Sequence, residues 1–213
     1  MKKRKLVFGM GSGRCGTASL ALLLNNQENS LVTHEMFPVL PWDISNTTSV
    51  QFRWEQLHHQ SHLYDMVGDV AAYYLPYVEF LMRSLAQVPH LQKGFDFKFI
   101  ILRRDPHEVV QSFLLKFERQ NNNPLQNHGD PSIVQNEWDA CYPKYDDVSL
   151  PQAVELYCKD YYAKAQELQE LFPENVRIFE MKCLNSEEGV LSMLNFIGIE
   201  NPRVITGIRK NQS

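Results

Sequence analysis

The chain has 213 residues, of which 44% are hydrophobic and 22% are charged. These values are typical of one globular domain, here residues 1–213, and exclude a disordered or fibrous chain. The formal net charge of −4 gives no general attraction to nucleic acid or to an anionic membrane, so any anion site has to be local.

The four cysteines are far apart in the sequence and form no C-x-x-C pair. No apolar run approaches the roughly 20 residues that a membrane-spanning helix needs. We therefore expect a cytoplasmic protein without a disulfide framework, a bound metal or a membrane insertion.

Strand-like and helix-like segments alternate along the chain. Short apolar runs predict strands at residues 5–10, 31–34, 63–69, 97–102 and 176–179. Helical spacing predicts helices at residues 17–24, 51–62, 73–85, 150–172 and 187–197, and another that begins at Pro106. The run 97–102 is apolar enough to be buried on both faces and is expected to be central. The alternation predicts an α/β fold with three layers, in which a central parallel sheet binds ligands at the carboxyl ends of its strands.

Residues 122–149 are predicted to form a long irregular segment, because they are rich in proline and asparagine and poor in aliphatic side chains. Long loops in compact domains are usually functional, so this segment is a candidate lid or acceptor loop. Trp138, Tyr142 and Tyr145 in it are candidates for binding an acceptor, or else they anchor the loop to the body.

A glycine-rich loop, GMGSGRCGTAS at residues 9–19, lies between the first predicted strand and the first predicted helix. Backbone N–H groups in such a loop, together with the helix dipole, form an anion site. The usual nucleotide-hydrolase pattern G-x-x-x-x-G-K-[ST] is nearly met, but Thr17 replaces the lysine and Ala18 replaces the hydroxyl that binds Mg²⁺. We expect a loop that works without magnesium and takes its positive charge from Arg14. The alternative is a plain turn with Arg14 in solvent.

A second motif, FIILRRDPHEVVQS at residues 99–112, places Arg104 at the end of the clearest strand and Ser112 on the following helix. Two such groups can converge on one anion. The alternative is that Arg104 pairs with Asp105 or Glu108 and that Ser112 faces solvent.

Both motifs resemble those of the sulfotransferases that use 3′-phosphoadenosine-5′-phosphosulfate (PAPS), closer to the bacterial, carbohydrate and protein-tyrosine types than to the cytosolic small-molecule type. RCGTAS is similar to their 5′-phosphosulfate loop [KR]-[ST]-G-T-[ST]-x, with departures at Cys15 and Ala18, and VGDVAAYYL at residues 67–75 resembles another family segment, with Val70 in place of a lysine. The resemblance implies that the 3′-phosphate binds to Arg104 and Ser112. It implies that the 5′-phosphosulfate binds to Gly11, Ser12, Gly13, Arg14, Cys15, Gly16, Thr17 and Ser19.

The resemblance also implies a reaction: transfer of a sulfuryl group from PAPS to a hydroxyl or amine acceptor, without a metal and with PAP as the product. Such a transfer needs a cation at the leaving phosphate, for which Arg14 is suited, and a base. Glu35 ends the second predicted strand at the same sheet edge as the loop and is the expected base, with His34 as its rival. Two alternatives remain: an ATP-dependent kinase with Asp69 as the Mg²⁺ ligand, and a module that binds PAP without catalysis.

Overall fold

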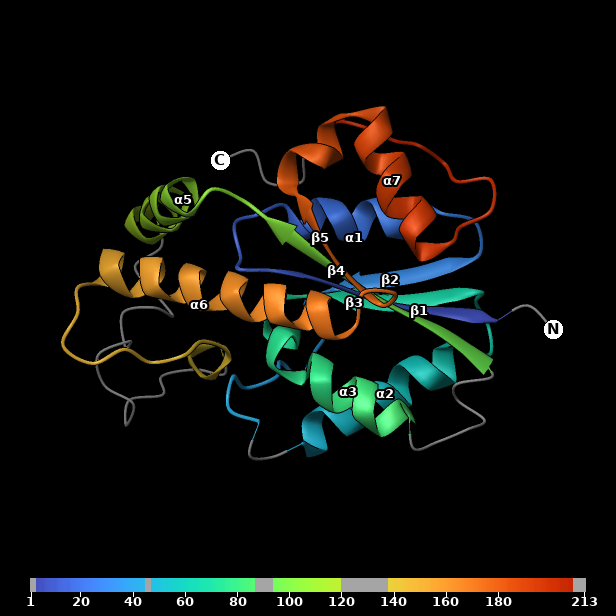
Figure 1. Ribbon diagram of the computed structural model, residues 1–213, viewed down its shortest axis with the longest axis horizontal. Helices are drawn as coiled ribbons and strands as arrows, with labels where there is room; N and C mark the ends of the chain where they lie inside the picture. Colours follow the sequence, from blue (N-terminus) through green and yellow to red (C-terminus); the bar gives the residue numbers. More distant parts are fainter. Residues whose placement is uncertain (1–2, 45–46, 87–93, 120–137, 209–213) are drawn as a thin grey trace.

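The computed structural model describes residues 3–44, 47–86, 94–119 and 138–208 (Figure 1). Within these ranges the strands form one sheet in the order β2-β3-β1-β4-β5, and every neighbouring pair is parallel. The strands are β1 (Arg4–Gly11), β2 (Ser30–His34), β3 (Met66–Val70), β4 (Phe95–Arg103) and β5 (Val176–Glu180). The single α/β domain with a parallel sheet is thus confirmed.

Helices cover both faces of the sheet. Figure 1 shows α1 and α7 on one face and α2, α3 and α6 on the other, while α5 lies beyond the carboxyl end of β4. The helices of the described part are α1 (Thr17–Asn25), α2 (Thr48–Gln60), α3 (Val78–Ala86), α5 (Pro106–Arg119), α6 (Leu150–Leu171) and α7 (Glu187–Ile197). Short 3₁₀ helices lie at η1 (Ala72–Tyr77), η2 (Asp139–Cys141) and η3 (Met181–Asn185).

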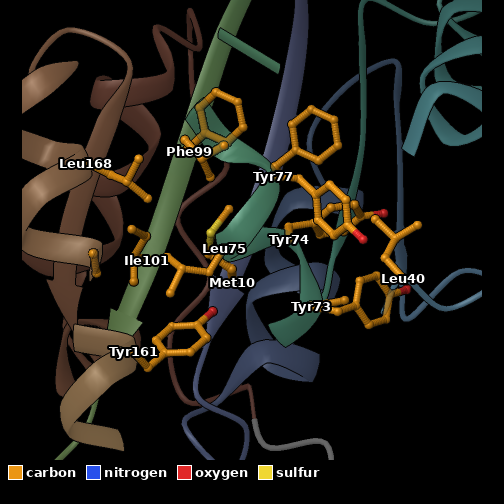
Figure 2. Close-up of a cluster of buried hydrophobic side chains, with 14 of the residues drawn as sticks. Met10, Leu40, Tyr73, Tyr74, Leu75, Tyr77, Phe99, Ile101, Tyr161 and Leu168 are labelled. Atoms are coloured by element: carbon orange, nitrogen blue, oxygen red, sulfur yellow. The ribbon is translucent and has the colours of Figure 1, made fainter. Parts of the chain in front are cut away.

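The core beneath α2, α3 and α6 is rich in aromatic side chains. Figure 2 shows Phe99 and Ile101 of β4 in one cluster with Leu168 of α6 and the tyrosines of η1. Each large apolar side chain that is fully buried contributes about 1.5–3 kcal/mol to the free energy of unfolding. This side of the sheet therefore forms a rigid support for the strand ends.

Two elements differ from the sequence expectation. The middle strand is β1, and the apolar β4 lies between β1 and β5, so it is an inner strand but not the central one. The helix predicted over residues 73–85 begins as the 3₁₀ helix η1 and becomes α-helical only at Val78. Pro76 has no N–H to donate, which explains why the α-helix starts after it.

The described end of the 122–149 segment is anchored to the body, while residues 122–137 lie outside the described residues. Tyr145 donates a hydrogen bond to Asp160 of α6 at 2.8 Å, and the ring centroid of Tyr142 lies 5.4 Å from that of Tyr157. Trp138 makes an edge contact with Phe37 at 6.2 Å. The two tyrosines thus anchor this end of the segment, which was one of the two roles expected for them.

None of the helices in the described ranges has both the length and the apolar character that a membrane crossing requires.

Candidate functional site

The glycine loop turns sharply between Gly11, where β1 ends, and Thr17, where α1 begins. Gly13 and Gly16 have φ angles of 84° and 89°, in the left-handed region that favours glycine. A Cβ at Gly13 would lie 2.9 Å from the ring of Phe113. No side chain caps α1 at Gly16, so the first N–H groups of this helix are available to an anion.

Two loop side chains point into the protein. Ser12 is fully buried, and its Oγ lies 3.0 Å from the hydroxyl of Tyr162 on α6. Cys15 is also fully buried, and burial raises the pKa of its thiol to about 12. Their predicted contacts with a phosphate are therefore limited to their backbone N–H groups. Ser19 lies in the first turn of α1, together with Thr17 and Ala18.

The two motifs meet at Arg14. Its Nε donates a hydrogen bond to Ser112 Oγ at 3.0 Å, although 98 residues separate the pair. Arg104 Nη1 donates to the backbone oxygen of Arg14 at 2.8 Å, and the Arg104 N–H donates to Tyr162 at 3.2 Å. The alternative pairing is also present, because Arg104 Nε donates to Glu108 at 2.8 Å. Ser112, in contrast, does not simply face solvent.

Lys116 is a charged residue of this site that the motifs did not reveal. It lies one helical turn after Ser112 on α5, so the two side chains share one face of the helix. Burial and the nearby charge of Arg14 lower the pKa of Lys116, and the carboxylate of Glu35 opposes that shift. The i, i+4 spacing between Ser112 and Lys116 is the sequence signal by which Lys116 could have been found.

His34 and Glu35 both lie at the edge of the site. β2 ends at His34, and Glu35 has a φ of 54°, so the alternation of side chains along the strand no longer separates them. His34 Nε2 lies 3.2 Å from Thr17 Oγ1, and His34 Nδ1 lies 3.7 Å from Glu35 Oε2. The side chain of Glu35 is 41% exposed, so it is open to a ligand.

Asp69, the Mg²⁺ ligand of the kinase alternative, is used inside the protein. It is fully buried at the end of β3 and pairs with Arg53 of α2 at 3.1 Å. Tyr74 and Thr33 each donate a hydrogen bond to it at 2.7 Å. A kinase would need another carboxylate for magnesium, and the ranges that the structure describes hold no cluster of three or more metal-ligating side chains.

The chain matches no protein-family model and no curated protein. Among solved structures it is similar to polyphosphate kinase 2 from Arthrobacter aurescens TC1, with a TM-score of 0.51 and 14% identity over 98% of this chain and 73% of that one. Shikimate kinase from Bacteroides thetaiotaomicron aligns with a TM-score of 0.45 and 11% identity over 92% of this chain and 99% of that one. The first likeness concerns the fold alone, a single α/β domain with a parallel sheet flanked by helices. Polyphosphate kinase 2 is not a sulfotransferase, so this likeness does not support the resemblance to that family.

Proposed function

We propose that this chain is a PAPS-dependent sulfotransferase, which transfers a sulfuryl group to a hydroxyl or amine group of an acceptor. The proposal rests on the hydrogen bond between Arg14 and Ser112, with Arg104 bound to the same loop residue. This contact joins the two motifs at one place, in a loop that lacks the P-loop lysine. A donor with phosphate groups at its 3′ and 5′ positions needs cations at two points, and two arginines supply them.

The cations act on the leaving group. The loop N–H groups and Arg14 hold the 5′-phosphosulfate, while Arg104 and Ser112 bind the 3′-phosphate. As the bond between sulfur and the bridging phosphate oxygen breaks, negative charge grows on that oxygen. Arg14 stabilises this charge, and Lys116, one helical turn after the Ser112 that Arg14 bonds, adds a second positive charge near Arg14.

Glu35 is the proposed base. Its carboxylate takes the proton of the acceptor hydroxyl as the acceptor oxygen bonds to sulfur and PAP departs. The exposure of the Glu35 carboxylate favours this role, since an acceptor can reach it. The rival His34 is already engaged, because its Nε2 lies within hydrogen-bonding distance of Thr17. His34 Nδ1, at 3.7 Å from Glu35, is placed to orient the carboxylate.

A Mg²⁺-ATP-dependent kinase is the second candidate, and the likeness of the fold to polyphosphate kinase 2 favours it. Against it stand Thr17 at the lysine position, Ala18 at the magnesium-binding position and the buried pairing of Asp69. A third alternative, a module that binds PAP without catalysis, shares the donor site and differs only in turnover.

Thermal unfolding with PAP, and separately with Mg²⁺-ATP, distinguishes the sulfotransferase from the kinase. A ligand at 100 times its Kd stabilises the native state by about 2.7 kcal/mol. For a chain of this size that raises Tm by about 5–10 °C. We expect this rise with PAP in the presence of EDTA. A rise only with Mg²⁺-ATP would contradict the proposal and support the kinase.

A further inference from the structure

The backbone that follows Glu35 is tied down by a buried polar network. The N–H of Met36 donates to both oxygens of Asp69, at 3.3 and 3.2 Å. The carbonyl of Met36 accepts hydrogen bonds from Arg53 and from the hydroxyl of Tyr73, the latter at 2.9 Å. Both polar groups of the residue after Glu35 are therefore held from inside the protein.

The network is sealed from water and internally satisfied. Asp69 and Arg53 are 0% and 1% exposed, and Arg53 also donates to the carbonyl of Pro38 at 2.6 Å. Burial and the Asp69 carboxylate raise the pKa of Tyr74 well above its ordinary value, so its hydroxyl remains a donor to Asp69. A buried ion pair is weak support for stability, because desolvation opposes the attraction between the charges. The hydrogen bonds of the network go to one short segment, residues 36–38, which indicates that the network positions this segment.

Glu35 itself needs such support. A φ of 54° at a residue other than glycine costs free energy and persists only where the surroundings fix it. On one side, the Glu35 N–H donates to the carbonyl of Val70 at 3.1 Å. On the other side, the network holds Met36. The two attachments together fix the turn from which the Glu35 side chain projects.

We propose that Asp69, Arg53 and Tyr73 are positioning residues that hold the Glu35 turn at the carboxyl edge of the sheet. Their role for catalysis rests on the proposed function, in which Glu35 is the base. The network explains why a carboxylate at the end of β3 is turned into the core and neutralised by an arginine from α2.

The test replaces one hydroxyl at a time. Tyr73→Phe removes the hydrogen bond to the Met36 carbonyl and a longer one to Asp69 at 3.4 Å. The matched control Tyr77→Phe removes the hydroxyl of another buried tyrosine of η1, which donates to Pro41 at 2.7 Å. Amide hydrogen exchange of residues 35–38 is measured against that of β1. We expect Tyr73→Phe to accelerate exchange of the Glu35 and Met36 amides about fivefold, as one lost hydrogen bond implies. Tyr77→Phe should leave those two amides unchanged.

Turnover with PAPS gives the second measurement. We expect kcat to fall about fivefold in Tyr73→Phe, with the KM for PAPS unchanged, because the donor site is built from other residues. Unchanged exchange at residues 35–38 would overturn the inference, and so would faster exchange with unchanged kcat. A third outcome is faster exchange in Tyr73→Phe together with no sulfuryl transfer by the wild type. This result would support the attachment of the Glu35 turn to the network and contradict the proposed function.

Discussion

Glu35 is the residue on which turnover and donor binding should separate. Glu35→Gln keeps the size and polarity of the side chain but removes the base, so we expect kcat to fall by about 10²–10⁴. The affinity for PAP should change little, because the predicted phosphate contacts come from the loop and α5. Sulfuryl transfer and PAP binding measured on the same preparation check this. Unchanged turnover in Glu35→Gln, with a large loss in His34→Gln, would assign the base to His34.

Glu108 competes with the 3′-phosphate for the side chain of Arg104. The Arg104–Glu108 ion pair is half exposed on the Glu108 side, and such pairs are worth about 0–1 kcal/mol. We therefore expect Glu108→Gln to bind PAP about two- to fivefold more tightly.

The matched control for this change is Glu79→Gln, which breaks a similar i, i+4 pair with Arg83 on α3. Titration calorimetry measures the affinity for PAP of the wild type, of Glu108→Gln and of Glu79→Gln. Weaker binding in Glu108→Gln would mean that Glu108 orients Arg104 and does not compete for it.

Among the elements, the loop between β1 and α1 depends on its contact with α5. Gly13→Ala places a methyl group at a φ of 84° and 2.9 Å from Phe113. Gly207→Ala is the matched control, because Gly207 has a φ of 69° but no atom within 4 Å of the point where its methyl group would lie. We expect Gly13→Ala to lower the free energy of unfolding by about 1–3 kcal/mol and to weaken PAP binding.

Thermal unfolding of the two glycine variants separates backbone strain from steric clash. The control should lose about 1–2 kcal/mol from its backbone angle alone, and less than Gly13→Ala loses. Equal losses in both variants would contradict a role for the contact between the loop and α5.

For the whole molecule, the sequence was sufficient for the class of fold, because local patterns carry that information. Short apolar runs located the five strands of the described part, and helical spacing located the helices between them. The glycine loop marked the carboxyl edge of the sheet. The order of the strands was not local information, so the central position of β1 required the structure. The sequence predicted that Arg104 and Ser112 converge on one anion, but it did not predict the hydrogen bond between Arg14 and Ser112.

Other parts of the site were hidden because they depend on contacts between distant segments. Arg53 lies on a polar helix, and nothing near it in the sequence indicates that it is fully buried against Asp69. The side chains of Glu35 and His34 lie close together only because β2 ends at His34 and the backbone turns at Glu35. Lys116 was detectable by its spacing from Ser112, but its relation to Glu35 depends on where α5 packs.

The central claim, a metal-independent site for a nucleotide with a 3′-phosphate, is tested most directly by calorimetric titration of PAP and AMP in EDTA. The two ligands differ only in that phosphate. Charge-assisted hydrogen bonds are worth about 1.5–3 kcal/mol, so the wild type should bind PAP about 10- to 100-fold more tightly than AMP. That ratio should approach one in Arg104→Ala and persist in Arg103→Ala, whose arginine instead bonds Glu180. Equal affinities for PAP and AMP in the wild type would contradict the account.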